Sequence, residues 1–255
     1  MSDVGKSVPP VRPGMTDALY LAETRQRTFG AHVERALDDR VVLDRTCFYP
    51  TGGGQPSDTG VLRDPVTETT WRVTGVEKRD TIHHMVDGNP PTAGTSLVGE
   101  LDWERRYAHM RYHTAQHLLS AVLLEAFDAE TTGNQLYADH AHLDCAYPRF
   151  SATDLADIEA RLNDLVAADL PVEWYVLDRG EAERRLDPER TRLHLLPDSI
   201  TEVRIVEVVG PDGTAYDRTA CAGTHVASTG AIGSVEVVGR ETKGTGEERI
   251  EFVLS

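Results

Sequence analysis

The sequence predicts an α+β fold, in which a small antiparallel β-barrel is followed by a two-layer α+β domain. Three observations predict it: short runs of alternating apolar and polar residues early in the chain, two later segments with the apolar spacing of helices, and strands grouped apart from those helices. We expect a disordered tail over residues 1–16, which contain three prolines, a barrel over 17–100 and the α+β domain over 101–255.

The barrel prediction depends on five short segments with the alternation of strands. Asp, Gly and Pro residues separate them, as expected for tight turns between antiparallel strands. The segments are 32–44, 60–64, 70–80, 81–88 and 96–102.

Two helices are predicted in the second half. Asp102 is placed to cap a helix over residues 103–129, whose later turns have an apolar face. Ser151 and Asp154 have the spacing of a capping box, and apolar residues at helical spacing follow until Pro171.

The other segments of this half are interpreted as strands, turns and one short helix. Residues 130–139 are predicted to be a loop leading into a strand, and 179–186 a short helix. Strands are expected at 172–178 and 200–209, with a closing hairpin formed by 233–241 and 247–254 around the turn 242–246.

Composition limits the functional class. Asp and Glu number 42 against 26 Lys and Arg, so the formal net charge is −16, and only three residues are lysines. Such a surface keeps a protein in solution and suggests a salt-loving source. It argues against a nucleic-acid partner unless the basic residues cluster at one site.

The expected location is the cytoplasm. The chain has no run of eighteen or more apolar residues, so no membrane span is expected, and its N-terminus lacks the apolar run of a signal peptide. Three cysteines in 255 residues do not indicate a disulfide scaffold, which fits a reducing compartment. Cys47 and Cys145 are expected to be buried thiols.

Two widely separated residue pairs predict a metal site. His113 and His117 are four apart in the first predicted helix, so both imidazoles project from one face. Cys221 and His225 are also four apart, in a segment interpreted as a loop around Gly223. One thiolate and three imidazoles suit tetrahedral Zn²⁺, so we expect one zinc ion per chain.

Four segments together carry a family resemblance. They are CFYPTGGGQPSDTG (47–60), RYHTAQHLLSAVL (111–123), CAGTHV (221–226) and RIEF (249–252). In this order they resemble AlaX-type alanyl-tRNA editing proteins, freestanding relatives of the editing domain of alanyl-tRNA synthetase. The resemblance runs from about residue 19 to the C-terminus. One departure is Ala222, because the family usually has two glycines after the cysteine.

The resemblance implies an N-terminal barrel, a domain shared by alanyl- and threonyl-tRNA synthetases, and hydrolysis of the ester between a wrong amino acid and tRNA(Ala). Serine is the expected error, with glycine as a second one. The implied partner is the acceptor end of mischarged tRNA(Ala). No ATP is expected, since no activation domain is identified. Oligomeric state stays open.

Zinc supports this chemistry because it lowers the pKa of bound water to about 7 and polarises a carbonyl group. Four protein ligands would fill a tetrahedral site, which is the mark of a structural ion. Catalysis would then require five-coordination or a weak ligand. We expect His225 to be the weak ligand, because it comes last in a flexible turn.

Selection against alanine requires recognition of the serine hydroxyl, because a pocket cannot exclude the smaller residue by size. Gln135 is the preferred candidate, at a position similar to a glutamine of the synthetase editing domain, with Thr132 and Asn134 as alternatives. In the GGGQP segment, the resemblance places a loop near the active site, so Gln55 is expected to reach the terminal adenosine. Gly53 and Gly54 would allow close backbone approach to the RNA.

Basic residues near both motifs are candidates for contact with tRNA phosphates. Arg105 and Arg111 flank the metal helix, and Lys243 and Arg249 lie on the closing hairpin. Arg106 and Arg240, in the same two segments, are further candidates, and Lys243 is the most suggestive because it is a rare lysine on a glycine-rich tip. Salt bridges with the many carboxylates are the competing interpretation for each of them.

Two other classes of protein remain open at this stage. A zinc-stabilised tRNA-binding module would have the same metal ligands without catalysis. A zinc peptidase is less consistent, because Thr114, Ala115 and Gln116 lie between the two histidines and the glutamate of HExxH is missing.

Overall fold

The computed structural model describes residues 14–191 and 193–255, which fall into two compact units, 14–107 and 108–255. Most of the expected N-terminal tail, residues 1–13, lies outside the described residues. At its end, Thr16 is buried, and its hydroxyl donates to the Leu43 carbonyl at 2.7 Å. Within the described residues, no helix is both long and apolar enough to cross a membrane.

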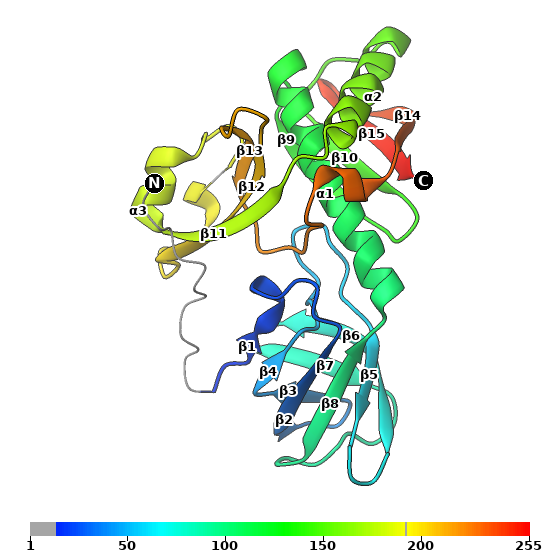
Figure 1. Cartoon of the computed structure of the whole chain (residues 1–255), viewed down its shortest axis with the longest axis vertical. Coiled ribbons are helices and arrows are strands. Elements are labelled where there is room, and N and C mark those ends of the chain that lie inside the picture. Colours follow the sequence, from blue (N-terminus) through cyan, green and yellow to red (C-terminus); the bar gives the residue numbers. More distant parts are fainter. Residues whose placement is uncertain (1–13, 192) are drawn as a thin grey trace. The chain divides into compact units, whose positions relative to one another are not determined.

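The first unit is a closed barrel of six antiparallel strands, as the sequence predicts (Figure 1). The strand order is β2-β3-β7-β6-β5-β8. The strands are β2 Thr28–Ala36, β3 Arg40–Leu43, β5 Gly60–Arg63, β6 Thr70–Lys78, β7 Ile82–Val86 and β8 Ser96–Leu101. Outside the barrel, the short strands β1 Asp17–Ala18 and β4 Arg45–Thr46 pair in parallel, and a 3₁₀ turn, η1, spans Leu19–Leu21.

Alternation along the strands fills the barrel with apolar side chains. In β2, Phe29, Ala31 and Val33 are buried while the residues between them are exposed. Gly60 permits a close backbone approach, since a Cβ atom there would lie 2.1 Å from the Glu100 carbonyl oxygen of the neighbouring strand. The apolar core of this unit also includes buried Cys47, as expected.

A buried ion pair joins the barrel to the first turn of the next helix. Arg106 and Asp58 are 0% and 1% exposed, and Arg106 Nε donates to both carboxylate oxygens, at 2.9 and 3.1 Å. The guanidinium also donates to the Thr24 carbonyl at 2.9 Å. These bonds satisfy the buried charges, and they exclude Arg106 from contact with an RNA phosphate.

The second unit contains two antiparallel sheets and the helices that cover them (Figure 1). One sheet has the order β14-β15-β10-β9 and the other β11-β12-β13. The strands are β9 Thr131–Leu136, β10 Ala141–Cys145, β11 Val172–Asp178, β12 Glu202–Val209, β13 Ala215–Ala220, β14 Val235–Gly244 and β15 Glu247–Leu254. The helices are α1 Trp103–Phe127, α2 Ala152–Ala167 and α3 Arg179–Arg185, with 3₁₀ turns η2 Leu193–Leu195 and η3 Thr229–Ile232.

Local sequence signals explain several of these elements. Ser151 and Asp154 form the expected capping box of α2, and Ile158 and Leu162 are the buried residues of that helix. Helix α1 begins where predicted and ends at Phe127, two residues early. The carboxylate of Asp102, expected as its cap, bonds to Arg72 and Thr59.

Three details differ from the sequence prediction. Residues 131–136 form strand β9 where a loop was expected, because pairing with β10 compensates for the weak strand preference of Gly133 and Asn134. Strand β13 was not predicted, since Asp217 and Arg218 interrupt its apolar pattern. Lys243 lies within β14, so the hairpin turn is shorter than expected.

Candidate metal centre

The structure brings the two predicted residue pairs together. His113 and His117 project from α1, and Cys221 and His225 lie in the loop between β13 and η3. One nitrogen of each imidazole and the Cys221 sulfur all lie within 4.8 Å of one another. The three histidines are 3–6% exposed. Four donors from two distant segments thus face one another in a largely dry site.

The spacing of the donors fits an ion of the size of Zn²⁺. Cys221 Sγ lies 3.6 Å from His113 Nε2 and 3.4 Å from His225 Nε2. A tetrahedral ion with Zn–S and Zn–N bonds of about 2.3 and 2.0 Å separates sulfur and nitrogen by roughly 3.5 Å. The donor set and these two distances therefore suit tetrahedral zinc without rearrangement of the loop.

At two of the four residues, Cys221 and His225, the electrostatics favour the protonation states that bind metals. Burial raises the pKa of the Cys221 thiol, but the neighbouring His113 and His225 outweigh this effect and hold the pKa well below its usual range. Burial, together with His113, lowers the pKa of His225 to about 3. A thiolate and a neutral imidazole are the forms that coordinate a metal.

A hydroxyl group on α1 orients His225. Thr114 Oγ1 donates to the Met110 carbonyl at 2.9 Å, so it is left to accept from His225 Nδ1, at 3.2 Å, and from the Val226 amide, at 3.3 Å. With the proton on Nδ1, the lone pair of Nε2 faces the cluster and is available to a metal ion. The expectation that His225 is loosely held does not agree with this geometry, because the side chain is buried and anchored at its far nitrogen.

A buried carboxylate lies behind His117. Asp217 Oδ2 is 3.5 Å from His117 Nδ1, and Arg190 holds the same carboxylate through two bonds of 2.8 and 2.9 Å. Burial opposes the charge on Asp217, but Arg190 and His117 outweigh it and lower the pKa of Asp217. A carboxylate behind a ligating histidine fixes the ring and its tautomer.

The cysteine loop is held by the side chain of Arg204 and by one of its own amides. Arg204 on β12 donates to the carbonyl groups of Cys221 and Gly223, at 2.7 and 3.2 Å, and the Gly223 amide donates to Cys221 Sγ at 3.3 Å. Ala222 is exposed and is not among the non-glycine residues with positive φ, so its methyl group fits the loop.

Among the candidates for recognising the amino acid, Asn134 contacts the metal helix. Its amide donates to Gln116 Oε1 at 3.0 Å, and Gln116 lies between the two histidines on α1. Gln135, one residue along β9, donates to the Leu136 carbonyl at 3.1 Å and pairs in register with His142. Thr132 donates to Glu247 at 2.7 Å. Alternation along a strand directs Asn134 and Gln135 to opposite faces of the sheet.

The GGGQP loop belongs to the first unit. Gln55 is 0% exposed, and its backbone forms an isolated antiparallel bridge with Gly52. Gly53 and Gly54 adopt φ of +59° and +79°, a conformation that favours glycine. Their roles in RNA contact remain predictions.

The basic candidates all have partners within the protein. Arg111 donates to the Ile232 and Ser255 carbonyls, both at 2.7 Å, and so ties α1 to the C-terminal end. Arg249 forms a bidentate pair with Asp144, while Lys243 lies 3.2 Å from the exposed Glu241. Arg105 donates to the Ser57 carbonyl at 3.2 Å. Contact of these four side chains with tRNA remains a prediction.

Sequence reasoning missed the residues behind the ligands. Asp217, Arg190 and Arg204 come from segments without a recognised motif. One signal was present for Asp217: it is a single carboxylate at an inward position of a strand that leads directly to Cys221. A buried carboxylate near a metal ligand is a common supporting group.

Two family models match this chain, one in each unit. The family model of class II (A) tRNA synthetases matches residues 15–105, and that of the threonyl and alanyl tRNA synthetase second additional domain matches residues 203–251. The chain is 41% identical over 246 residues to the alanyl-tRNA editing protein AlaX-M of Methanosarcina barkeri, covering 94% of this chain and 99% of the relative. It is 38% identical over 248 residues to AlaX-M of Methanosarcina acetivorans, covering 94% and 99%.

A longer relative is matched only in part. The alanine–tRNA ligase of Pyrobaculum neutrophilum is 37% identical over 242 residues, which cover 93% of this chain and 27% of the ligase. The likeness to AlaX-M therefore extends over nearly the whole of both chains, and it confirms the resemblance that the sequence motifs indicated. The chain belongs to the family of AlaX-type alanyl-tRNA editing proteins.

Proposed function

We propose that this protein is a trans-editing hydrolase that uses one Zn²⁺ ion per chain to deacylate mischarged tRNA(Ala). The substrate is Ser-tRNA(Ala), with Gly-tRNA(Ala) as a second one. The observation that carries the proposal is the convergence of His113, His117, Cys221 and His225. The relatives named alanyl-tRNA editing proteins support the choice of substrate.

The reaction is the hydrolysis of an ester. A water molecule attacks the carbonyl carbon, the bond from that carbon to the ribose oxygen breaks, and the ribose oxygen takes a proton while the amino acid leaves as an acid. Zinc held by His113, His117, Cys221 and His225 would supply an acidified water and polarise the carbonyl. The reaction consumes no ATP and belongs in the cytoplasm, where tRNA is charged.

The residues of this chain hold the site in the required state. Thr114 accepts from the far nitrogen of His225, Asp217 lies 3.5 Å from that of His117, and the three histidine side chains are buried. Preorganised groups need no rearrangement when charge develops in the transition state.

For recognition of serine we retain Gln135, Gln55 and Thr132 as the proposed substrate-contacting residues. We add Asn134, because its amide is the one that bonds to the metal helix, beside Gln116. When the substrate carries alanine, such an amide has no hydroxyl to bond, and the cost of its desolvation would disfavour alanine relative to serine. For the tRNA we retain Arg105, Arg111, Lys243 and Arg249, with the backbone at Gly53 and Gly54.

The central experiment is release of serine from Ser-tRNA(Ala), with Ala-tRNA(Ala) as the control substrate. We expect rapid release of serine, little release of alanine, and loss of activity when a chelator removes the metal, with recovery on addition of Zn²⁺. Activity that survives complete removal of the metal would contradict the zinc mechanism.

A variant separates recognition from metal binding. Gln135→Ala should lower serine release more than it lowers zinc content, and Asn134→Ala provides the parallel test for the neighbouring strand position. Equal loss of both quantities would indicate a structural role for the substituted residue.

The alternative is a zinc-stabilised tRNA-binding module without catalysis. One observation favours it: four protein donors fill a tetrahedral ion, which is typical of structural sites. This alternative predicts tRNA binding that depends on zinc, without any deacylation in the same assay.

A further inference from the structure

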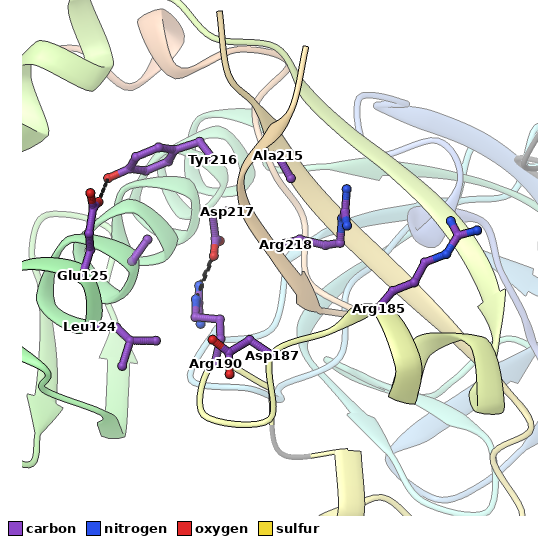
Figure 2. Close-up of a pocket in the computed structure, with 10 residues that line it drawn as sticks. Leu124, Glu125, Arg185, Asp187, Arg190, Ala215, Tyr216, Asp217 and Arg218 are labelled. Carbon is purple, nitrogen blue, oxygen red and sulfur yellow. Dashed lines mark hydrogen bonds and ion pairs between the residues drawn. The ribbon is translucent and has the colours of Figure 1, made fainter. Parts of the chain in front are cut away.

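A pocket of about 410 Å³ lies in the second unit, between α1, strand β13 and the segment that follows α3. Its volume falls in the range of about 300–1,000 Å³ that is usual for small-ligand sites. Figure 2 shows Tyr216 and Glu125 at one end of the pocket, Asp217 and Arg190 at its centre, and Arg218 and Arg185 at the other end.

The pocket adjoins the metal cluster along the same two elements. On α1, Ala121 follows His117 by one turn and Glu125 by two, so they lie about 6 and 12 Å further along the helix axis. On the other wall, β13 continues directly into the loop of Cys221. Asp217 lines the pocket and also lies 3.5 Å from His117 Nδ1. The pocket therefore lies behind His117, on the side of Asp217, and the four metal donors are not among the residues that line it.

Three arginines, Arg185, Arg190 and Arg218, line the pocket together with the carboxylates of Glu125, Asp187 and Asp217. Arg185 Nε contacts Glu181, and Arg218 Nε contacts Glu207 at 2.6 Å. A guanidinium has five N–H donors, more than one such carboxylate oxygen accepts, so its terminal nitrogens can also bind a phosphate. Arg190 differs, because two of its nitrogens bind Asp217.

The opposite end offers an aromatic ring. Tyr216 is half-buried, and its hydroxyl lies 3.5 Å from Glu125 Oε2. Aromatic side chains beside a basic groove are the usual platform on which single-stranded bases stack.

We propose that this pocket binds a nucleotide of the acceptor strand upstream of the one that carries the ester, with a phosphate at Arg185 and Arg218 and a base against Tyr216. The proposal rests on the proposed function, because the ester at the metal cluster defines which end of the RNA enters the pocket. It adds a binding site for the acceptor strand that lies outside the metal ligands.

The test uses the zinc-loaded protein and a labelled, uncharged RNA hairpin with the acceptor-end sequence of tRNA(Ala). Fluorescence anisotropy gives Kd, and zinc content and thermal stability are measured for each variant. Arg185→Ala should weaken binding about tenfold or more at low salt, as expected for loss of a charge-assisted hydrogen bond. The slope of log Kd against log salt should fall by about 0.7, the value for one phosphate contact on a single strand.

The matched control is Arg184→Ala. Arg184 and Arg185 are neighbours on α3 and both pair with Glu181, but only Arg185 lines the pocket. We expect the control to keep the parent's Kd and salt slope. Equal weakening by both variants, or by neither, would overturn the proposal.

Tyr216 provides a second test. Tyr216→Ala should weaken binding about tenfold by loss of stacking, and Tyr216→Phe should restore it. In serine release, both pocket variants should raise KM while kcat at saturating Ser-tRNA(Ala) is retained. A loss confined to kcat would contradict a binding role.

Two further outcomes separate this inference from others. AMP that displaces the hairpin at concentrations near the hairpin's own Kd would identify a site for free nucleotides and overturn the RNA-end assignment. If no serine release is found but Arg185→Ala still weakens hairpin binding selectively, the proposed function fails and the pocket assignment stands. Normal serine release with an unchanged KM in Arg185→Ala would mean that the proposed function stands and the pocket assignment fails.

Discussion

His225 and His117 each have a protein side chain at the ring nitrogen that faces away from the cluster, and the two side chains differ. Thr114 accepts from His225, and Asp217 lies behind His117. These partners come from α1 and β13, the elements that carry or adjoin the ligands. Ring orientation is thereby set by the protein before an ion binds, which lowers the cost of assembling the site.

Thr114→Val is expected to weaken zinc binding by about 10- to 100-fold, because it removes the acceptor that fixes His225 Nδ1. Competition with a chromophoric chelator measures the affinity. Thr114→Ser keeps the hydroxyl and should bind zinc like the parent. Equal affinity in the valine and serine variants would show that this bond does not orient the ring.

His84 should make the free energy of unfolding of the first unit depend on pH. Burial, with a smaller contribution from His83, lowers the pKa of His84 to about 4, and its Nε2 lies 2.8 Å from Thr46 Oγ1. Unfolded histidine titrates near 6.5, so the unfolded chain binds more protons between pH 6.5 and 4. The free energy of unfolding should fall as pH falls through this window, by up to about 3 kcal/mol.

His84→Gln should flatten this part of the pH dependence, measured by urea denaturation at pH 7, 6, 5 and 4. Comparison with the parent cancels the titration of the metal ligands, which both proteins share. His140→Gln, at an exposed position, serves as control. Parallel curves for the parent and His84→Gln would assign the acid sensitivity elsewhere.

At the scale of elements, the capping box of α2 allows a direct test. Ser151 Oγ accepts from the Asp154 amide, and the Asp154 carboxylate accepts from the Ser151 amide. Ser151→Ala should cost about 1 kcal/mol, and Ser151→Asp, which keeps an acceptor, much less. Urea denaturation followed by circular dichroism measures both. A cost for Ser151→Asp as large as that for alanine would contradict the capping role.

An element can be predicted from the sequence when the residues that determine it lie within the element itself. The barrel and α2 were predicted because alternation and the Ser151 cap are local signals, although the predicted segment 32–44 contains the end of β2 and the whole of β3. Strand β9 was missed because its pairing partner, β10, determines its conformation. Spacing identified the four metal donors, but Asp217 and Arg190 could not be assigned from it, since only the fold brings them to His117.

At the scale of the whole molecule, the net charge of −16 should make stability depend on salt. Self-repulsion extends over about 30 Å at 0.01 M salt and about 3 Å at 1 M. We expect Tm to rise by roughly 5 °C or more between these concentrations, measured with NaCl and repeated with KCl. An unchanged Tm in both salts would mean that paired charges already cancel the repulsion.

The distance in sequence between the two halves of the metal cluster has a consequence for biosynthesis. His113 and Cys221 are 108 positions apart, so a bound ion closes a very long loop. A covalent cross-link over about 100 residues is worth about 4.7 kcal/mol in chain entropy. Because the ribosome delivers the thiolate long after the first two imidazoles, an ion held by all four donors would be captured late in maturation, and chains made under metal starvation would lack this closure.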